Sequence, residues 1–227
     1  MTGRPAIELV VFDMAGTTVH DDDTVNRILR ESLASFGVHA EPEQVNRVMG
    51  LPKPLAIETI LRTVGDASPD VDAIHAEFVA QAIGFYGRDA SVREAPGATE
   101  VFRVLAASGV RIALDTGFSR VIADVILDRL GWRDGSLIAA TVCSDEVARG
   151  RPFPDMIERL TRDLEVRDPS RVAKVGDTPS DLEEGSSAGC GLVVGIAGAT
   201  HTRAQLAAYR HTHLIDSLRE FPVLIGL

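Results

Sequence analysis

The sequence has few cysteines, an excess of acidic residues and no long apolar run. Two cysteines among 227 residues are too few for a disulfide framework or a cysteine-based zinc motif, so we expect both to be buried thiols in a reducing compartment. The formal net charge of -10 disfavours nucleic acid and anionic membranes as partners. No stretch approaches the ~18 apolar residues that span a bilayer, and no export signal is recognisable. We therefore expect a cytoplasmic protein.

Short apolar runs alternate with helical patterns over most of the chain. Hydrophobic residues make up 45% and charged residues 25%, which is typical of a globular protein. Strands are expected at 7–12, 110–114, 137–142, 172–175, 192–196 and 213–215, and helices at 97–108, 119–130, 154–164 and 180–188. This alternation predicts an α/β fold with a doubly wound parallel sheet, whose active site lies at the carboxyl ends of the strands.

The interval from 20 to 94 lacks a convincing strand. Helical patterns occur there at 24–36, 43–49, 54–64 and 70–87. We therefore expect an all-helical cap domain at 20–94, inserted after the first strand into a core domain formed by 1–19 and 95–227. The cap would lie over the end of the strand that carries Asp13.

A second carboxylate is missing from the first polar cluster, Asp13-Met14-Ala15-Gly16-Thr17. Asp13 follows an apolar strand and is placed to attack phosphorus, while backbone amides near Gly16 hold phosphate oxygens. Enzymes with this chemistry usually have another aspartate two residues later, which protonates the leaving group, but here the residue is Ala15. The alternative is that Asp13 merely caps a turn.

Three further polar clusters follow predicted strands and should converge with Asp13. Thr116 and Gly117 form a candidate anion site at a helix start, unless they are only a helix cap. Arg151 stands in a rigid Gly-Arg-Pro frame and could grip two phosphate oxygens; the alternative is a lone surface arginine, although such arginines rarely sit in so rigid a frame. Asp177 and Asp181 suit Mg²⁺, with helix capping as the alternative. Together the clusters supply the parts that phosphoryl transfer needs.

The order and content of these clusters resemble the haloacid dehalogenase superfamily, in the form with a helical cap. The resemblance implies that Asp13 is a nucleophile that becomes an aspartyl phosphate, and that Thr116 and Arg151 bind the phosphoryl group. It also implies a Mg²⁺ cofactor held by Asp13, the backbone carbonyl of Ala15, Asp177 and Asp181.

Ala15 and Arg151 are similar to the phosphonatase branch, as is the cap segment Met49-Gly50-Leu51-Pro52-Lys53. The resemblance implies that Met49 contacts the substrate and that Lys53 forms a Schiff base with its aldehyde. Lys53 comes directly before Pro54, which suits a first helical position, so the helix dipole and apolar neighbours favour a neutral amine. A solvated lysine at a loop end is the alternative.

An imine at Lys53 would explain the absence of an acid at position 15. Cleavage of a C–P bond releases a carbanion, and an iminium accepts those electrons without a proton. We therefore expect a hydrolase that cleaves the C–P bond of a 2-oxoalkylphosphonate such as phosphonoacetaldehyde. Phosphonatases have a histidine three residues after the lysine, where this chain has Ala56, so His20 or His75 are candidates for the proton transfers.

Two other functions stay open at this point. The chain could be a phosphate monoester hydrolase resembling phosphoglycolate phosphatase, with Lys53 as a cap residue only, or a non-catalytic anion-binding module. The resemblance also allows a homodimer through the cap. The only other expected partner is a small phosphonate or phosphate.

Overall fold

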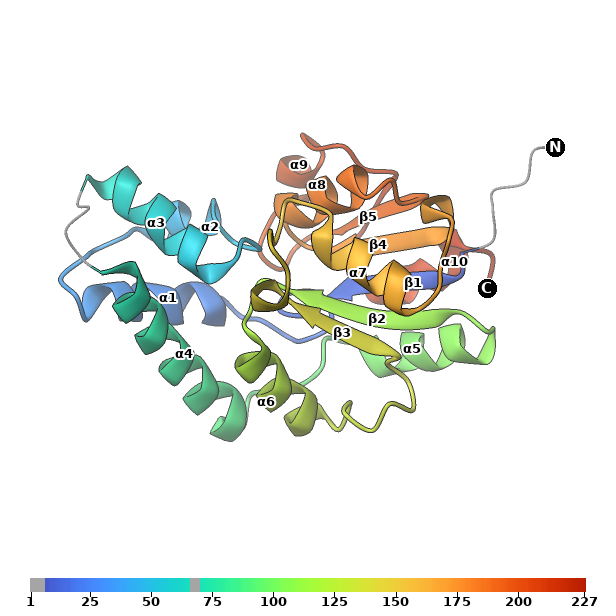
Figure 1. Cartoon of the computed structure of the whole chain (residues 1–227), viewed down its shortest axis with the longest axis horizontal. Coiled ribbons are helices and arrows are strands. Elements are labelled where there is room, and N and C mark those ends of the chain that lie inside the picture. Colours follow the sequence, from blue (N-terminus) through green and yellow to red (C-terminus); the bar gives the residue numbers. More distant parts are fainter. Residues whose placement is uncertain (1–6, 66–69) are drawn as a thin grey trace.

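The computed structural model describes residues 7–65 and 70–227, and these residues form one parallel sheet flanked by helices (Figure 1). The sheet order is β3-β2-β1-β4-β5-β6. Its strands are β1 (Leu9–Asp13), β2 (Arg111–Thr116), β3 (Ala140–Cys143), β4 (Val172–Gly176), β5 (Leu192–Ile196) and β6 (His213–Ile215). The predicted doubly wound α/β fold is confirmed.

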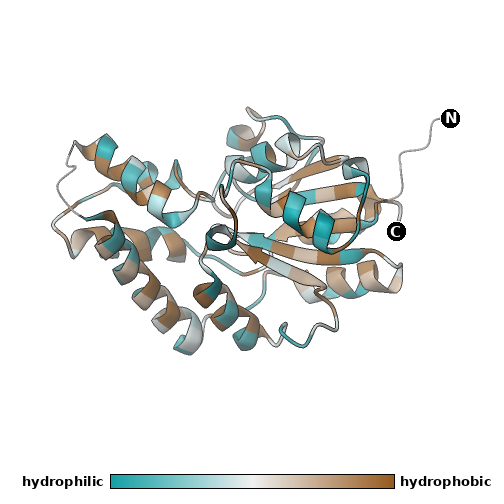
Figure 2. Ribbon diagram, in the orientation of Figure 1, coloured by the Kyte–Doolittle hydropathy of each residue, from teal (hydrophilic) through white to brown (hydrophobic). Residues whose placement is uncertain are grey.

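Strand β1 lies in the middle of the sheet and sends side chains into two separate cores. Val10 and Phe12 pack toward α5 (Ala98–Ala107), α6 (Arg120–Leu130) and α10 (Phe221–Leu224), whereas Leu9 and Val11 pack toward α7 (Asp155–Asp163). Helices α8 (Pro179–Ser187) and α9 (Arg203–Leu206) cover the same face as α7, over β4 and β5. Hydrophobic residues line these strands (Figure 2). Each buried aliphatic or aromatic side chain contributes roughly 1.5–3 kcal/mol, so both faces anchor Asp13.

The interval between β1 and α5 is helical, as expected. It contains α1 (Thr24–Ala34), α2 (Pro42–Asn46), α3 (Lys53–Val64) and α4 (Val71–Arg88), and its described residues form no strand. We call α1 to α4 and their connections the helical insert. Helix α4 packs against α1 and α3, and also against α6 of the sheet region. The division into two domains at 20 and 94 stays a prediction.

Helix α2 is shorter than the sequence predicts, and this matters for the site. It ends at Asn46, and Gly50, at a φ of 84°, turns the chain before Pro52. Glycine adopts such a φ without the steric penalty that a side chain brings. Met49 and Gly50 therefore belong to a connecting loop, and Lys53 is the first residue of α3.

The expectation that both cysteines are buried is met only in part. Cys143 is buried, but Cys190 is half-buried, because it lies in the turn after α8 rather than inside a strand. Across 7–65 and 70–227, no helix combines the length and apolar character that crossing a membrane would require. A homodimer through the helical insert stays a prediction.

Candidate active site

Residues from seven segments surround one small cavity at the carboxyl ends of the strands. The segments are the loops after β1, β2, β4 and β5, the start of α1, the α2–α3 loop with the start of α3, and the Gly150–Pro152 segment. The cavity has a volume of about 20 Å³, and its lining includes Asp13, Ala15, Met49, Lys53, Thr116, Gly117 and Arg151. This is room for about one water molecule, so the insert is closed over the core.

The loop after β1 is pressed against Asp177. Gly16 has a φ of 90°, and a Cβ added there would lie 2.2 Å from Oδ2 of Asp177, so only glycine fits. Thr17 donates a hydrogen bond from Oγ1 to Oδ1 of Asp177 over 3.3 Å. The backbone N–H of Thr200 donates to Oδ2 over 3.2 Å. These contacts fix Asp177 beside the loop that carries Asp13 and Ala15.

Three buried carboxylates form a candidate metal centre. Asp13, Asp177 and Asp181 each present an oxygen, and the three oxygens lie within 4.8 Å of one another. Burial raises the pKa of Asp13 to about 7, although Arg151 opposes the shift. Burial, followed by the charges of Asp13 and Asp181, raises the pKa of Asp177 well above its ordinary range. A hard divalent cation would reverse these shifts, so the cluster fits a metal with oxygen ligands.

Arg151 is buried among carboxylates and does not lie on the surface. Its Nη1 lies 2.6 Å from Oδ1 of Asp13 and 3.0 Å from Oδ1 of Asp181. Its Nε lies 3.0 Å from Oε2 of Glu184, and Nη2 binds the side chain and the backbone carbonyl of Asp115. Because Nη1 is the guanidinium nitrogen that contacts Asp13, it is the atom that a phosphoryl group at Asp13 would meet.

Sequence reasoning missed the groups behind Arg151. Lys174 on β4 lies 3.1 Å from both Asp181 and Glu184, and it also binds Asp115. Burial alone would raise the pKa of Asp115, but Arg151 and Lys174 hold it below its ordinary value. The sequence spacing could have indicated Glu184, because it follows Asp181 by three residues and therefore lies on the same face of α8.

Thr116 and Gly117 follow β2 at the same edge of the sheet as Asp13. Thr116 is buried, and its Oγ1 accepts a hydrogen bond from the N–H of Phe118 over 3.2 Å. The hydroxyl hydrogen of Thr116 is therefore free to turn toward the cavity that both residues line. This arrangement suits an anion.

Lys53 enters the site from the helical insert. Its side chain is 3% exposed, and Nζ lies 5.3 Å from the ring centre of Phe118 and 5.7 Å from that of Phe78. Burial lowers the pKa of Lys53 to about 8, with Asp13 acting to raise it and Arg151 acting to lower it. A substantial fraction of the amine is therefore neutral near pH 8, so the solvated-lysine interpretation is wrong.

The α2–α3 loop of the insert packs against the core and closes the cavity. A Cβ on Gly117 would lie 2.8 Å from the carbonyl oxygens of Gly50 and Leu51, closer than side chains tolerate. Ser180 of α8 donates from Oγ to the carbonyl oxygen of Met49 over 3.4 Å. Met49 and Ala56 are both buried. A substrate larger than one water can enter only when this loop moves.

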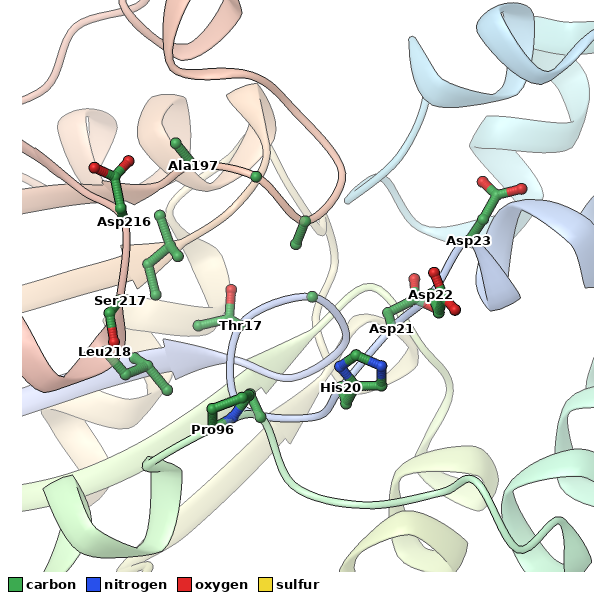
Figure 3. Close-up of a pocket in the computed structure, with 15 residues that line it drawn as sticks. Thr17, His20, Asp21, Asp22, Asp23, Pro96, Ala197, Asp216, Ser217 and Leu218 are labelled. Atoms are coloured by element: carbon green, nitrogen blue, oxygen red, sulfur yellow. The ribbon is translucent and has the colours of Figure 1, made fainter.

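The two histidines singled out from the sequence lie in different places. His20 lies in the segment between β1 and α1 and lines a neighbouring cavity of about 560 Å³ (Figure 3). His75 on α4 is half-buried, and burial followed by the charge of Lys53 lowers its pKa. Neither lines the cavity shared by Asp13 and Lys53.

Known proteins are similar to the chain over most of its length. The family model for haloacid dehalogenase-like hydrolases matches residues 7–189. A phosphonoacetaldehyde hydrolase of Syntrophobacter fumaroxidans is 32% identical over 200 residues, which are 81% of this chain and 70% of the relative.

Solved structures agree in fold. A phosphonoacetaldehyde hydrolase-like protein from Oleispira antarctica has a TM-score of 0.86 at 24% identity, covering 98% of this chain and 92% of that one. A structure named as a predicted phosphoglycolate phosphatase from Haemophilus somnus has a TM-score of 0.80 at 18% identity, covering 98% and 99%. With the family match over residues 7–189 and the parallel sheet, the chain belongs to the haloacid dehalogenase-like hydrolases.

Proposed function

We propose that this hydrolase cleaves the C–P bond of a 2-oxoalkylphosphonate such as phosphonoacetaldehyde. The observation that carries the proposal is Lys53, a buried amine with a lowered pKa that lines the same cavity as the carboxylate of Asp13. An amine in this state attacks a carbonyl, and the carboxylate attacks phosphorus. A phosphate ester offers no carbonyl for which such an amine would be needed.

The roles of the core residues follow from their positions. Asp13 is the nucleophile, and the Nη1 of Arg151, 2.6 Å from Asp13, neutralises charge on the phosphoryl oxygens. Thr116 and the amides near Gly16 and Gly117 hold the remaining oxygens. Asp13, the Ala15 carbonyl, Asp177 and Asp181 would hold Mg²⁺, which neutralises phosphoryl charge and keeps the nucleophile ionised.

The reaction balances with these groups. Lys53 as a neutral amine, the substrate carbonyl and one proton form an iminium and release water. Asp13 then attacks phosphorus, the C–P bond breaks, and its electron pair moves into the iminium to give an enamine. Water hydrolyses the aspartyl phosphate to inorganic phosphate. Protonation of the enamine carbon and hydrolysis of the resulting iminium release the aldehyde and restore Lys53.

Position 15 supports C–P cleavage over ester cleavage. An ester leaving group departs as an alkoxide and gains about 10²- to 10⁴-fold from a general acid, which Ala15 cannot supply. The enamine needs no proton when the bond breaks. The fold is shared by proteins named for either activity, so the choice rests on Lys53 and Ala15.

Phosphate release from matched substrates tests the proposal. We expect Mg²⁺-dependent release from phosphonoacetaldehyde that EDTA abolishes, and a fall of at least 10³-fold in Lys53→Ala. Release from small phosphate esters should be slow in both proteins. Brisk ester turnover that Lys53→Ala leaves unchanged would instead support a phosphatase. Metal-dependent binding of ligands without release from any of them would indicate a non-catalytic module.

A further inference from the structure

Imine formation requires proton transfers for which no acid–base group has been assigned so far. The attacking nitrogen must lose protons, and the carbonyl oxygen must gain two before it leaves as water. Ala56, one turn along α3 from Lys53, carries only a buried methyl group. Asp13 is the proposed nucleophile at phosphorus, and the guanidinium of Arg151 is bound by carboxylates, so neither is available for these proton transfers. The remaining titratable groups near Lys53 are the candidates.

Asp21 is held in place beside this site. It lies in the segment that leads from the loop after β1 to α1 (Figure 3). Its Oδ1 accepts hydrogen bonds from the N–H groups of Thr24, over 2.8 Å, and Val25, over 3.2 Å. Val25 itself lines the cavity with Lys53. One oxygen of Asp21 thus anchors the carboxyl to the first turn of α1, while no hydrogen bond to Oδ2 is found among the described residues.

The charges of Asp21 and Lys53 act on each other. Burial raises the pKa of Asp21 above its ordinary value, while the two N–H groups of α1 and the charge of Lys53 oppose the shift. Asp21 in turn acts to raise the pKa of Lys53. A carboxylate that is a stronger base than a solvated aspartate, and whose charge acts on a neighbouring amine, suits acid–base chemistry.

Tyr86 on α4 has a buried hydroxyl group near the ring of Phe118, against which Lys53 also lies. Its side chain is 2% exposed, and its hydroxyl has no hydrogen-bond partner in the described part of the chain. The ring packs edge-on against Phe118, 5.8 Å between centres, and Phe118 is the ring over which Lys53 lies. Burial, then the charges of Asp21 and Asp13, raise its pKa. A buried hydroxyl without a partner is costly, which indicates that a ligand completes it.

We propose that Asp21 is the acid–base group for the imine at Lys53, and that the hydroxyl of Tyr86 binds the substrate carbonyl oxygen. This inference rests on the proposed function. The Asp21 carboxylate takes a proton from the Lys53 ammonium, and the neutral amine adds to the carbonyl carbon. Asp21 returns the proton to the oxygen held by Tyr86, takes another from nitrogen, and gives it to the departing hydroxyl. Water leaves, the iminium forms, and Asp21 is again a carboxylate.

His75 and His20 fit this role less well. His75 is half-buried on α4 and does not line the cavity of Lys53. His20 lines the larger cavity next to the site, as Asp21 does (Figure 3). Asp21 is favoured because it is hydrogen-bonded to Val25, which lines the cavity of Lys53. The backbone N–H of His20 is paired with the carbonyl of Arg93, in the segment that returns from the insert.

The test is the rate at which Lys53 forms an imine. Phosphonoacetaldehyde is mixed with enzyme in single-turnover experiments, borohydride is added at set times, and the mass of the Lys53 peptide is measured. Asp21→Asn keeps the oxygen that caps α1, so it should fold with an unchanged Tm and form the imine about 10²- to 10⁴-fold more slowly. Tyr86→Phe should slow the same step.

The matched control is Asp22→Asn, which removes an exposed carboxylate from the same segment and should form the imine at the wild-type rate. His75→Asn should also behave as wild type. Unchanged imine formation in Asp21→Asn, or a loss confined to His75→Asn, overturns the inference while leaving the proposed function intact. Absence of any Lys53 adduct in wild type refutes the proposed function itself, so the two failures are distinguishable.

Discussion

At the scale of single residues, the chain contains only two lysines, and their environments are opposite. Lys53 lies against aromatic rings, and burial lowers its pKa to about 8. Burial also acts to lower the pKa of Lys174, but the carboxylates of Asp115, Glu184 and Asp181 outweigh it and hold that pKa above its ordinary value. Lys53 is thus suited to reaction, whereas Lys174 holds carboxylates in place.

The two lysines should respond oppositely to replacement by methionine. The unfolded chain keeps the Lys53 proton up to about pH 10.4, while the folded chain releases it near pH 8, so Lys53 costs stability at pH 7 and the cost shrinks as the pH rises across that window. Lys53→Met should therefore stabilise by on the order of 2 kcal/mol at pH 7 and less near pH 10.

Lys174→Met is the matched comparison. It leaves buried carboxylates without their partner and should destabilise by about 3–5 kcal/mol at pH 7. Urea unfolding of both variants at pH 7 and pH 10 measures these changes. A destabilised Lys53→Met protein would contradict the environment described for Lys53.

At the scale of elements, the α2–α3 loop closes the site by approaching the backbone after β2. The carbonyl oxygens of Gly50 and Leu51 pass where a side chain at Gly117 would stand. The cavity that remains is too small for the proposed substrate, so the proposed function requires the loop to open and close in each turnover. Loop closure then brings Lys53, on α3, against the core.

Gly117→Ala tests this closure. The added methyl group would lie 2.8 Å from two carbonyl oxygens and hold the loop open, so we expect kcat/KM for phosphonoacetaldehyde to fall roughly 10- to 100-fold with little change in Tm. Gly84→Ala in α4 is the control, because its methyl group meets only the flexible end of Arg88, 3.8 Å away. It should leave kcat/KM unchanged and stabilise by about 0.5–1 kcal/mol. Full activity in Gly117→Ala would contradict the role of the loop.

The sequence allowed the elements to be predicted better than the contacts between them. The six strands were found within a few residues, because a buried parallel strand reads as a short apolar run. The meeting of Asp13, Thr116 and Asp177 followed from the rule that parallel strands end at one edge. The carboxylates around Arg151 could not be predicted from this rule, because Glu184 and Asp115 reach Arg151 from α8 and β2 through tertiary packing.

At the scale of the whole molecule, the helical insert lies beside the sheet region (Figure 1), and the candidate site takes residues from both. The sheet edge supplies the acidic cluster and Asp13, the proposed nucleophile, and the insert supplies Lys53. Asp21 and Tyr86 were beyond sequence reasoning for this reason: one lies in the connecting segment and the other on α4, and only the packing of α4 against α1 and α6 brings them near Lys53. The account therefore requires both parts to act on one substrate molecule.

Borohydride reduction with phosphonoacetaldehyde tests this central claim most directly. Because the chain has two lysines, the peptide masses show which of them carries the adduct. We predict a reduced adduct on the Lys53 peptide, as the phosphonoethyl form before C–P cleavage or the ethyl form after it, and an unmodified Lys174 peptide. Phosphate release with no adduct on Lys53 would contradict the account.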